Sequence, residues 1–484
     1  MSRNPDRLVR LDVDNRILSR EECEAIAQRV FRAARGGGET RVRIGSWWQG
    51  ELRWGRNRVS LASDRRDVSI AVSRGEPFEQ LGFPAQTNQL DDASIDALVR
   101  AAERARARSA HVSPAVYLPK MPPLPSPDTK IWSDATYGLT AEARGELARS
   151  LVSSSEAQRM LSAGYAEVRA ATFAEMSSTI RAGSPANFET PYAAWTQAQC
   201  SMTVRDSQGT GSGWAGLSSY DWAKLDNSSL AERALDKCLR SRNPVALEPG
   251  RYTVILEPQA VADLMEAVID SLSRENAESG RGPFVLAQDE ALGIIRTKLG
   301  LKVMDERISI SHDYADPALG VVPEVGAAGA PVSWIDHGVL SALSYDRDYA
   351  LTLLGAPLGL RRAQGYRMSG GTTTQEEMIQ STKRGLLVTR FSNIGMLDET
   401  SLLCTGLTRD GLWLIENGKI TKPVKNFRFT ESPLFVLNNL EQLGEPVPVF
   451  RPTPLQGGRG ELTPAIVPAL KARDFSFTSL VDAV

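Results

Sequence analysis

A long run of alternating residues limits what the first part of this chain can fold into. Residues 40–75, "TRVRIGSWWQGELRWGRNRVSLASDRRDVSIAVSRG", alternate apolar and polar side chains and contain turn residues in place of helical spacing. The pattern predicts three or four antiparallel strands. Residues 19–35 precede the run with a capping box, Ser19 and Glu22, and residues 92–109 follow it with helical periodicity. The sequence therefore predicts an N-terminal α+β domain over residues 1–110, with antiparallel strands flanked by helices.

The same order of elements recurs further along the chain. A proline-rich stretch, residues 111–130, separates the two parts and is predicted to be an extended linker. Residues 131–246 then predict a middle α+β segment with a helix, several strands and a closing helix near 228–240. Its turns are expected at Gly183-Ser184 and at Ser207-Gln208-Gly209. No residue-level repeat accompanies this similarity, which is one of pattern alone.

Residues 247–484 predict a third, β-rich domain with one early helix. A short apolar strand, Tyr252–Leu256, leads into a helix at 257–276, and short strands broken by Gly and Pro follow. Residues 410–424 predict a hairpin that turns at Asn417-Gly418. The predicted fold class is α+β, with N-terminal antiparallel sheet units and their flanking helices followed by this C-terminal β-rich domain.

Composition excludes several broad classes of protein. The chain has 56 basic and 58 acidic residues and a net charge of −2, so there is no general electrostatic reason to expect nucleic acid or an anionic membrane as partner. The four cysteines form no CxxC pair, which argues against a zinc knuckle or a dithiol redox motif. The charged N-terminus lacks the apolar core of a signal peptide, and no run approaches the roughly 20 apolar residues of a membrane span. We expect a cytoplasmic protein with reduced, buried thiols.

Six local patterns follow one another in a fixed order along the second half of the chain: "PGRYTVILEPQAVADLM" (249–265), "LGLKVMDERISISHDYADP" (299–317), "GAPVSWIDHGVLSALSYDRDYA" (329–350), "MSGGTTTQEEMI" (368–379), "GLLVTRF" (385–391) and "GLWLIENGKITKPVKNFRFTES" (411–432). In this order they resemble the TldD/PmbA family. By that resemblance the catalytic member is a metalloprotease, in which the helix entering the C-terminal domain carries HExxxH and a cysteine near the C-terminus completes a zinc site. The second member, of the TldE or PmbA type, has the same fold without the metal site and pairs with the catalytic subunit around a proteolytic chamber.

The resemblance places "MEAVID" where HExxxH would stand. Met265 and Asp270 then occupy the histidine positions and Glu266 that of the glutamate, while residues 454–475 contain no cysteine. Residues five apart lie about 140° apart around a regular helix, so a zinc site of this spacing requires local distortion. The resemblance therefore implies that Met265, Glu266 and Asp270 are degenerate positions. No residue of this chain is then catalytic, none binds a metal or cofactor, and zinc is expected in the catalytic partner.

Other residues offer alternatives that the sequence leaves open. Glu266 could survive as a general base, or join Asp270 in a site for a hard cation, although two carboxylates alone bind such ions poorly. Cys404 could be a nucleophile, but its apolar neighbours favour a buried thiol. The glycines of residues 205–216 favour a hairpin turn over a phosphate loop. The remaining candidates are a zinc site from the isolated histidines and a contact surface from the tryptophans: His111, His312, His337, Trp47, Trp48 and Trp54.

Taken with the resemblance, these residues favour a non-catalytic TldE/PmbA-like subunit of a TldD/TldE-type metalloprotease complex that processes or degrades unfolded peptides. Its expected partners are a TldD-like catalytic subunit, in a heterodimer or larger assembly, or a second copy of itself, together with extended peptide substrates. The alternative is a stand-alone homodimeric peptidase or peptide-binding protein that uses no HExxxH site. The sequence alone therefore leaves open whether the chain is an enzyme by itself.

Overall fold

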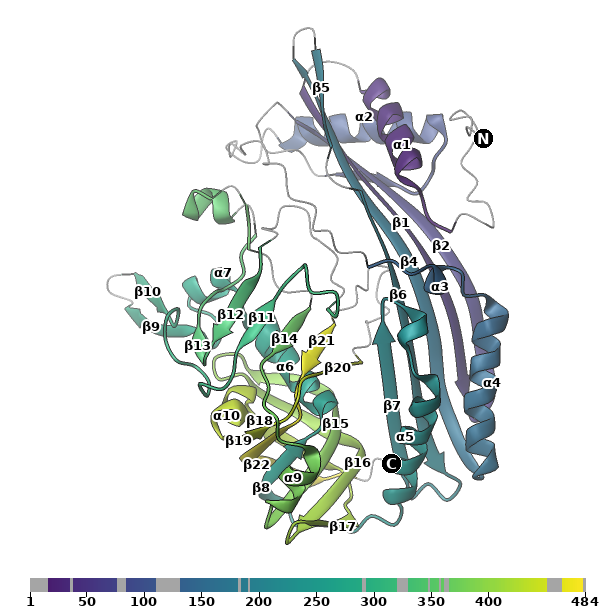
Figure 1. The fold of residues 1–484 in the computed structure, drawn as a ribbon. Helices are drawn as coiled ribbons and strands as arrows, with labels where there is room; N and C mark the ends of the chain where they lie inside the picture. Colours follow the sequence, from purple (N-terminus) through teal and green to yellow (C-terminus); the bar gives the residue numbers. More distant parts are fainter. Residues whose placement is uncertain are drawn as a thin grey trace.

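The computed structural model describes residues 16–34, 38–75, 84–109, 131–181, 184–189, 192–289, 293–319, 330–346, 349–356, 358–360, 365–450 and 464–481. Two parts are visible in Figure 1: a long, curved antiparallel sheet from the first half of the chain, and a β-rich part from the second half. The predicted α+β class is confirmed.

The long sheet is built from unusually long strands. Its order is β3-β2-β1-β4-β6-β7, with β5 added beside β4, and every pairing is antiparallel. The strands are β1 (Gly38–Gly55), β2 (Arg58–Gly75), β3 (Ala85–Thr87), β4 (Met160–Arg181), β5 (Ser184–Glu189), β6 (Ala193–Asp206) and β7 (Ser212–Ser219).

The alternating run at residues 40–75 forms one hairpin of two long strands, so the prediction of three or four strands there is wrong. Strands β1 and β2 each have 18 residues and turn at Arg56 and Asn57, whose φ angles are 50° and 61°. Gly50 does not make a turn. It serves close packing, because a Cβ at this position would lie 2.3 Å from Nη1 of the buried Arg144.

Strand β1 also pairs with β4 along nearly its whole length, from Gly38 opposite Ile180 to Trp54 opposite Gly164. The two predicted α+β units therefore contribute to one continuous sheet. Their boundaries at the proline-rich segment stay a prediction. The turn expected at Ser207-Gln208-Gly209 is present between β6 and β7, where Gly209 has a φ of 72°. Gly183 lies outside the described residues.

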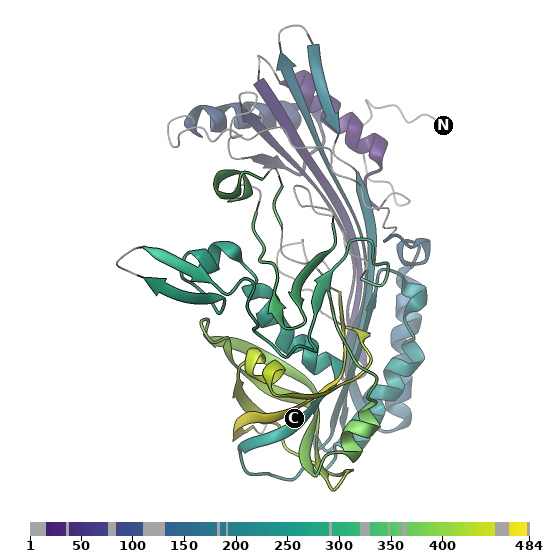
Figure 2. The same cartoon turned by 60° about the vertical axis from the view of Figure 1, so that its left-hand side comes forward.

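The helices cover the sheet with three apolar clusters. Even-numbered residues of β1 point to them: Val42 and Ile44 pack in the first cluster, Trp48 in the second, and Leu52 and Trp54 in the third. The first helix begins with the predicted capping box of Ser19 and Glu22. Figure 2 shows α4 on the outer side of the sheet and the C-terminal part on the opposite side. The helices are α1 (Arg20–Ala33), α2 (Asp92–Ser109), α3 (Asp134–Tyr137), α4 (Ala141–Ala157), η1 (Trp222–Lys224) and α5 (Asn227–Arg240).

The C-terminal part contains a closed barrel. Strands β15, β8, β22, β18 and β16 pair in that order, and β16 pairs back to β15, so that these strands leave no open edge in the ring. Phenylalanines fill it, with the rings of Phe391 and Phe429 4.6 Å apart and those of Phe475 and Phe477 4.9 Å apart. The strands of this sheet are β8 (Gly250–Leu256), β15 (Arg384–Asp398), β16 (Leu403–Glu416), β17 (Lys419–Pro423), β18 (Phe427–Glu431), β19 (Leu440–Leu443) and β22 (Leu470–Leu480).

A second sheet and several short helices complete this part. The predicted helix at 257–276 ends earlier, at Ser271, and the short helix α7 follows after the cap of Ser273. The predicted turn at Asn417-Gly418 is confirmed, with φ angles of 50° and 76°. The remaining elements are α6 (Pro258–Ser271), α7 (Arg274–Glu278), β9 (Val285–Asp289), β10 (Ile294–Thr297), β11 (Ile310–His312), β12 (Val332–Asp336), β13 (Val339–Leu340), η2 (Ala350–Leu354), β14 (Tyr366–Met368), α9 (Gln375–Gln380), α10 (Pro433–Asn438), β20 (Val447–Val449) and β21 (Ala465–Val467).

A buried polar joint connects the long sheet to the barrel. Ser212 of β7 donates to Oδ1 of Asp410 on β16 over 2.5 Å, and Nε of Arg390 on β15 lies 3.2 Å from the other carboxylate oxygen. The guanidinium of Arg390 stacks 4.4 Å from the ring of Trp214 on β7. The carboxylate of Asp410 is therefore bound by residues from both halves of the chain. Over the described part of the chain, no helix is long and apolar enough to cross a membrane.

Candidate functional site

Helix α6, which carries the degenerate motif, presents its residues on different sides. Met265 is only 1% exposed and packs in the large C-terminal core with Leu264, Val268 and Ile269. Glu266 and Asp270 are exposed. The helix continues to Ser271, so the two positions at which the resemblance places histidines point one into the core and one outward.

The same helix is fixed to its surroundings by a third carboxylate. Asp263 accepts the backbone N–H of Phe391 on β15 over 2.8 Å and the side-chain amide of Gln259 over 2.9 Å. At the other end, the carbonyl of Leu272 accepts the N–H and the hydroxyl of Ser344. These polar groups thus hold α6 in place against β15 of the barrel and against the segment around Ser344, which follows β13.

The fold places part of residues 454–475, where the resemblance expects a cysteine, beside α6, but this part supplies no thiol. Strand β21 contacts α6, and the expected cysteine would fall in this region. Cys404 instead lies on β16, where its Sγ is 3.5 Å from the carbonyl oxygen of Leu402 and burial raises the pKa of the thiol. The other cysteines are buried as well, and burial raises the pKa of Cys200 to about 12. The prediction of buried, free thiols is confirmed.

The histidines do not converge. His312 is buried on β11, where Nδ1 lies 2.8 Å from the carbonyl oxygen of Gly365. His337 is exposed in a turn, 2.8 Å from Asp336. His111 lies outside the described residues. Within the described ranges, no group of three or more His, Cys, Asp or Glu side chains is arranged to hold a metal ion.

The zinc site that the resemblance associates with this helix does not fit the side chains present. Such a site uses neutral imidazole and thiolate ligands that converge on an open position. Here one helical position holds a thioether buried in the core, the other an exposed carboxylate, and the described part of the C-terminal stretch supplies no thiol. The helix is a packing element of the C-terminal core.

Restoring the two histidines alone should fail to create a zinc site. We expect the double variant Met265→His with Asp270→His to bind no stoichiometric zinc, because residue 265 points into the core. It should also lose roughly 1–3 kcal/mol of unfolding free energy, since an imidazole at residue 265 is buried without a designed partner. Metal analysis after gel filtration and urea unfolding measure both effects. Asp270→His alone, at an exposed site, is the matched control and should stay within about 0.5 kcal/mol. Tight, stoichiometric zinc in the double variant would contradict this account.

The tryptophans and the glycine-rich turn have structural places. Trp48 and Trp54 are buried on the helix side of the sheet, which supports the packing interpretation. Trp47 lies on the other face, with the guanidinium of Arg169 5.7 Å from its ring. In the turn between β6 and β7, Asp206 accepts the backbone N–H of Thr210 over 2.7 Å. This is a capped hairpin turn, as the sequence predicts.

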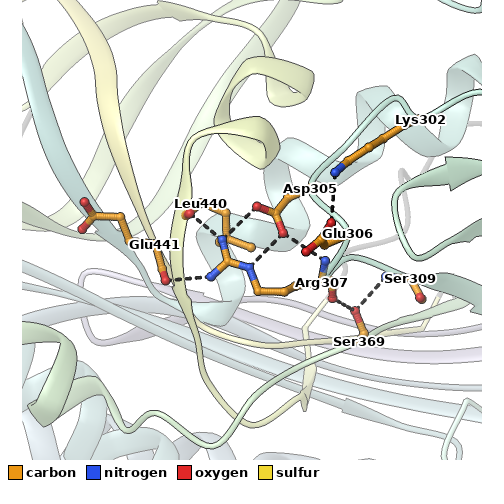
Figure 3. A network of polar contacts seen from close by, with 8 residues as sticks. All are labelled: Lys302, Asp305, Glu306, Arg307, Ser309, Ser369, Leu440 and Glu441. Carbon is orange, nitrogen blue, oxygen red and sulfur yellow. Dashed lines mark hydrogen bonds and ion pairs between the residues drawn. The ribbon is translucent and has the colours of Figure 1, made fainter.

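A polar network organises one of the segments on which the family resemblance rests. Arg307 makes two bonds of 2.8 Å to the carboxylate of Asp305 and donates to the carbonyl oxygens of Leu440 and Glu441. Figure 3 shows the guanidinium between them, with Ser369 bound to the backbone of the same segment. The hydrogen bond from Arg307 lowers the pKa of Asp305 to about 2. The network fastens the segment before β11 to β19.

The stability that this network provides should depend on pH. Because the pKa of Asp305 is lower in the folded protein than its ordinary 3.8, the contribution is fully present above about pH 4 and is lost as pH falls through about 2. We expect Asp305→Asn to lower the unfolding free energy by about 1–2 kcal/mol near pH 7, a value reduced for the partial exposure of the pair. The difference should shrink towards pH 3 in urea unfolding. Glu306→Gln, in the exposed pair with Lys302, is the control and should change little.

Comparisons with known proteins agree with this architecture, in which a long sheet is followed by a β-rich part that begins with β8 and α6. Residues 249–479 match the sequence model of a family described as PmbA/TldA metallopeptidase C-terminal domain, so the class is that of metallopeptidase-like proteins. Residues 249–479, just under half of the chain, therefore form a C-terminal domain of the TldD/PmbA family. A relative named as a metalloprotease, from Methanothermobacter thermautotrophicus, is 23% identical over 231 residues, which cover 45% of this chain and 48% of that protein. The match thus spans about half the length of that relative.

Solved structures share the whole fold. TldE from Thermococcus kodakarensis aligns with a TM-score of 0.72 and 16% identity, over 94% of this chain and all of the other. A Thermotoga maritima protein described as a modulator of a DNA gyrase aligns with a TM-score of 0.73 and 16% identity, over the same shares. A Bacteroides thetaiotaomicron protein with a similar description aligns with a TM-score of 0.68 and 17% identity, over 96% of this chain and all of the other. At these identities the likeness concerns the fold.

Proposed function

We propose that this chain is the non-catalytic, TldE-like subunit of a two-chain metallopeptidase that acts on unfolded or extended peptides. The observation that carries the proposal is the chemistry of α6: Met265 is part of the core and Asp270 is exposed at the two positions where the resemblance expects zinc-binding imidazoles. The proposed partner is a TldD-like chain with an intact HExxxH helix, and that partner supplies the zinc. The complex is proposed to work in the cytoplasm.

In this proposal the long sheet and the barrel contribute walls to a chamber shared with the partner. The buried joint of Ser212, Asp410 and Arg390 supports a fixed angle between the two parts of this chain. Glu266 is exposed on a helix that has a methionine and an aspartate at the two ligand positions, so this chain offers no imidazole pair there to hold the zinc-bound water that a general base of this family would activate. The role left to the chain is to bind and position the peptide and the partner.

Co-purification from the native host tests the pairing. A tagged copy of this chain should recover a HExxxH-bearing chain in roughly equal amount, and the mixture should hydrolyse extended peptides in a chelator-sensitive way. The purified chain alone should contain no stoichiometric zinc and hydrolyse none of these peptides. Chelator-sensitive hydrolysis by the chain alone would contradict the proposal in favour of a stand-alone peptidase. Recovery of a homodimer without any HExxxH chain would favour a peptide-binding protein.

A further inference from the structure

A row of polar side chains is buried on the inner face of the long sheet, the face opposite its helices. Glu51 of β1 lies directly opposite Glu167 of β4, which lies opposite Gln199 of β6. These residues are 3%, 5% and 5% exposed. All three are odd-numbered, so they point away from the apolar clusters under the helices. Figure 2 shows the C-terminal part on this side, where the ring of Phe450 lies 6.2 Å from that of Tyr165.

Two carboxyl groups face each other in this row, which a buried place in a sheet disfavours. Directly opposite side chains of neighbouring strands lie close enough to interact, and two carboxylates there repel each other. Glu51 is bound by Arg53 of the same strand. Burial raises the pKa of Glu167, and the charge of Glu51 raises it further. The hydrogen bond from Gln199 and the charge of Arg169 act in the opposite direction. Glu167 therefore favours its protonated form more than an exposed glutamate does.

Gln199 adds an acceptor that has no donor. Its Nε2 donates to Oε1 of Glu167 over 3.1 Å. Its own Oε1 is buried and, within the part of the chain that the structure describes, accepts no hydrogen bond. A buried carbonyl oxygen without a donor costs free energy, which a ligand that brings a donor recovers. The row thus presents three acceptor groups side by side on one face, two carboxyls and one amide oxygen.

Charged and titratable neighbours of Glu167 lie on its own strand and on β1, while β6 contributes the uncharged Gln199. On β1, Arg53 is already bound to Glu51. On β4, the guanidinium of Arg169 lies 5.7 Å from the ring of Trp47. Burial raises the pKa of Tyr165, so this phenol is neutral. A cation that enters the row therefore replaces the proton of Glu167 and leaves the ion pair on β1 in place.

The acceptor set favours an ammonium group over a metal ion. A primary ammonium carries one positive charge and three N–H donors, one for each carboxyl and one for the amide oxygen. Ca²⁺ takes about 6–8 oxygen ligands and Mg²⁺ keeps several waters, which a row this deeply buried does not offer. The described residues also include no group of three or more His, Cys, Asp or Glu side chains arranged for a metal ion.

We propose that the row of Glu51, Glu167 and Gln199 binds a primary ammonium group of an extended peptide, either its α-amino group or a lysine side chain. Glu167 gives up its proton to solvent as the ammonium binds, so one positive charge replaces another. The side chain of Arg53, bound to Glu51, is 40% exposed, so the row reaches solvent at that end. The proposal rests on the proposed function, since it gives the non-catalytic subunit a subsite for an amine of the peptide.

Fluorescence anisotropy with the purified full chain tests the ammonium. Three forms of one decapeptide of alternating Ala and Thr carry a label at the C-terminus: one with a free α-amino group, one N-acetylated, and one N-acetylated with an internal lysine. The acetylated form should bind about tenfold or more weaker than the free form, because it lacks the charge-assisted hydrogen bonds. Tighter binding of the lysine form than of the acetylated form assigns the row to both kinds of ammonium. Equal binding of these two restricts it to the α-amino group.

Glu167→Gln keeps the size of the side chain and removes its charge. It should weaken binding of the free form about tenfold or more and change binding of the acetylated form by less than about twofold. Thermal unfolding near pH 7 should show no loss of stability, because the change removes a buried carboxylate opposite Glu51. Glu175→Gln is the matched control, since Glu175 is equally buried on the same strand and face and is bound by Arg41 and Arg43. It should leave both affinities unchanged.

The unsubstituted chain provides a test that needs no variant. Because the pKa of Glu167 is raised above its usual 4.5, the proton that competes with the ammonium is lost as pH rises through that raised value. Affinity for the free form should therefore rise from about pH 5 to about pH 7, where the α-amino group stays mostly protonated. Binding should release a proton, which titration calorimetry in buffers of different ionisation enthalpy measures. Glu167→Gln should abolish both effects.

Equal affinity for the free and acetylated forms, or no binding of the free form, would overturn the proposal. So would Ca²⁺ or Mg²⁺ that binds stoichiometrically and displaces the free form, since the row would then be a metal site. These results are separate from the pairing experiment above. A HExxxH partner that co-purifies and hydrolyses peptides, while the free and acetylated forms bind alike, upholds the proposed function and removes only the subsite.

Discussion

Glu266→Gln in this chain should leave peptide hydrolysis by the reconstituted complex within about twofold of the unsubstituted complex. The same change at the glutamate of the partner's HExxxH helix should lower the rate by about 10²- to 10⁴-fold, the range that a positioned general base contributes. The reason is the chemistry of the neighbouring positions: Glu266 is exposed on a helix whose ligand positions hold a core methionine and an exposed carboxylate, so the helix has no imidazole pair to hold a metal-bound water for it.

The two substitutions are matched, because each removes one negative charge at the same position of the family pattern. Rates should be measured at equal complex concentration, with gel filtration to verify that the subunits remain associated. A loss of tenfold or more from the change in this chain, with the complex intact, would show that α6 still takes part in chemistry. The proposed non-catalytic role would then be wrong.

Removing the carboxylate at the joint should cause the largest loss of stability. Asp410 is buried, accepts the hydroxyl of Ser212 from the long sheet, and pairs with Arg390 of the barrel. We expect Asp410→Ala to lower the unfolding free energy by about 3 kcal/mol, because a guanidinium is left without its partner in a mostly buried place. Asp410 also has a φ of 55°, which alanine tolerates less well than aspartate or asparagine.

Asp410→Asn separates these causes, since it keeps the shape and the backbone preference and removes the charge. Its loss should be smaller, about 1–2 kcal/mol. Asp236→Ala, in an exposed pair with Arg240, is the control and should change stability by less than about 0.5 kcal/mol. Urea unfolding followed by tryptophan fluorescence reports the joint directly, because Trp214 lies against Arg390. Equal stability of Asp410→Ala and Asp236→Ala would rule out a structural role for this carboxylate.

Much of the local structure could be predicted because its causes are local. The cap of Ser19 and Glu22, the Asn417-Gly418 turn and the strand that leads into α6 all follow from residues within a few positions of one another. The glycines of β1 misled the prediction. Gly50 is needed where Arg144 approaches from a helix about ninety residues later, and nothing in its local sequence distinguishes that use from a turn.

The features of the candidate site also fall into two groups: those that the sequence determines and those that depend on tertiary structure. The sequence by itself determined that α6 has no imidazole and that residues 454–475 have no thiol, because residue identity needs no structure. Tertiary structure decided that Met265 is core and Asp270 exposed, that β1 and β4 join the two halves of one sheet, and that Asp410 holds the sheet to the barrel. Each of these depends on which segments pair or pack. Such partners lie up to about two hundred residues apart, and the period of a strand reveals its two faces but not the strand beside it.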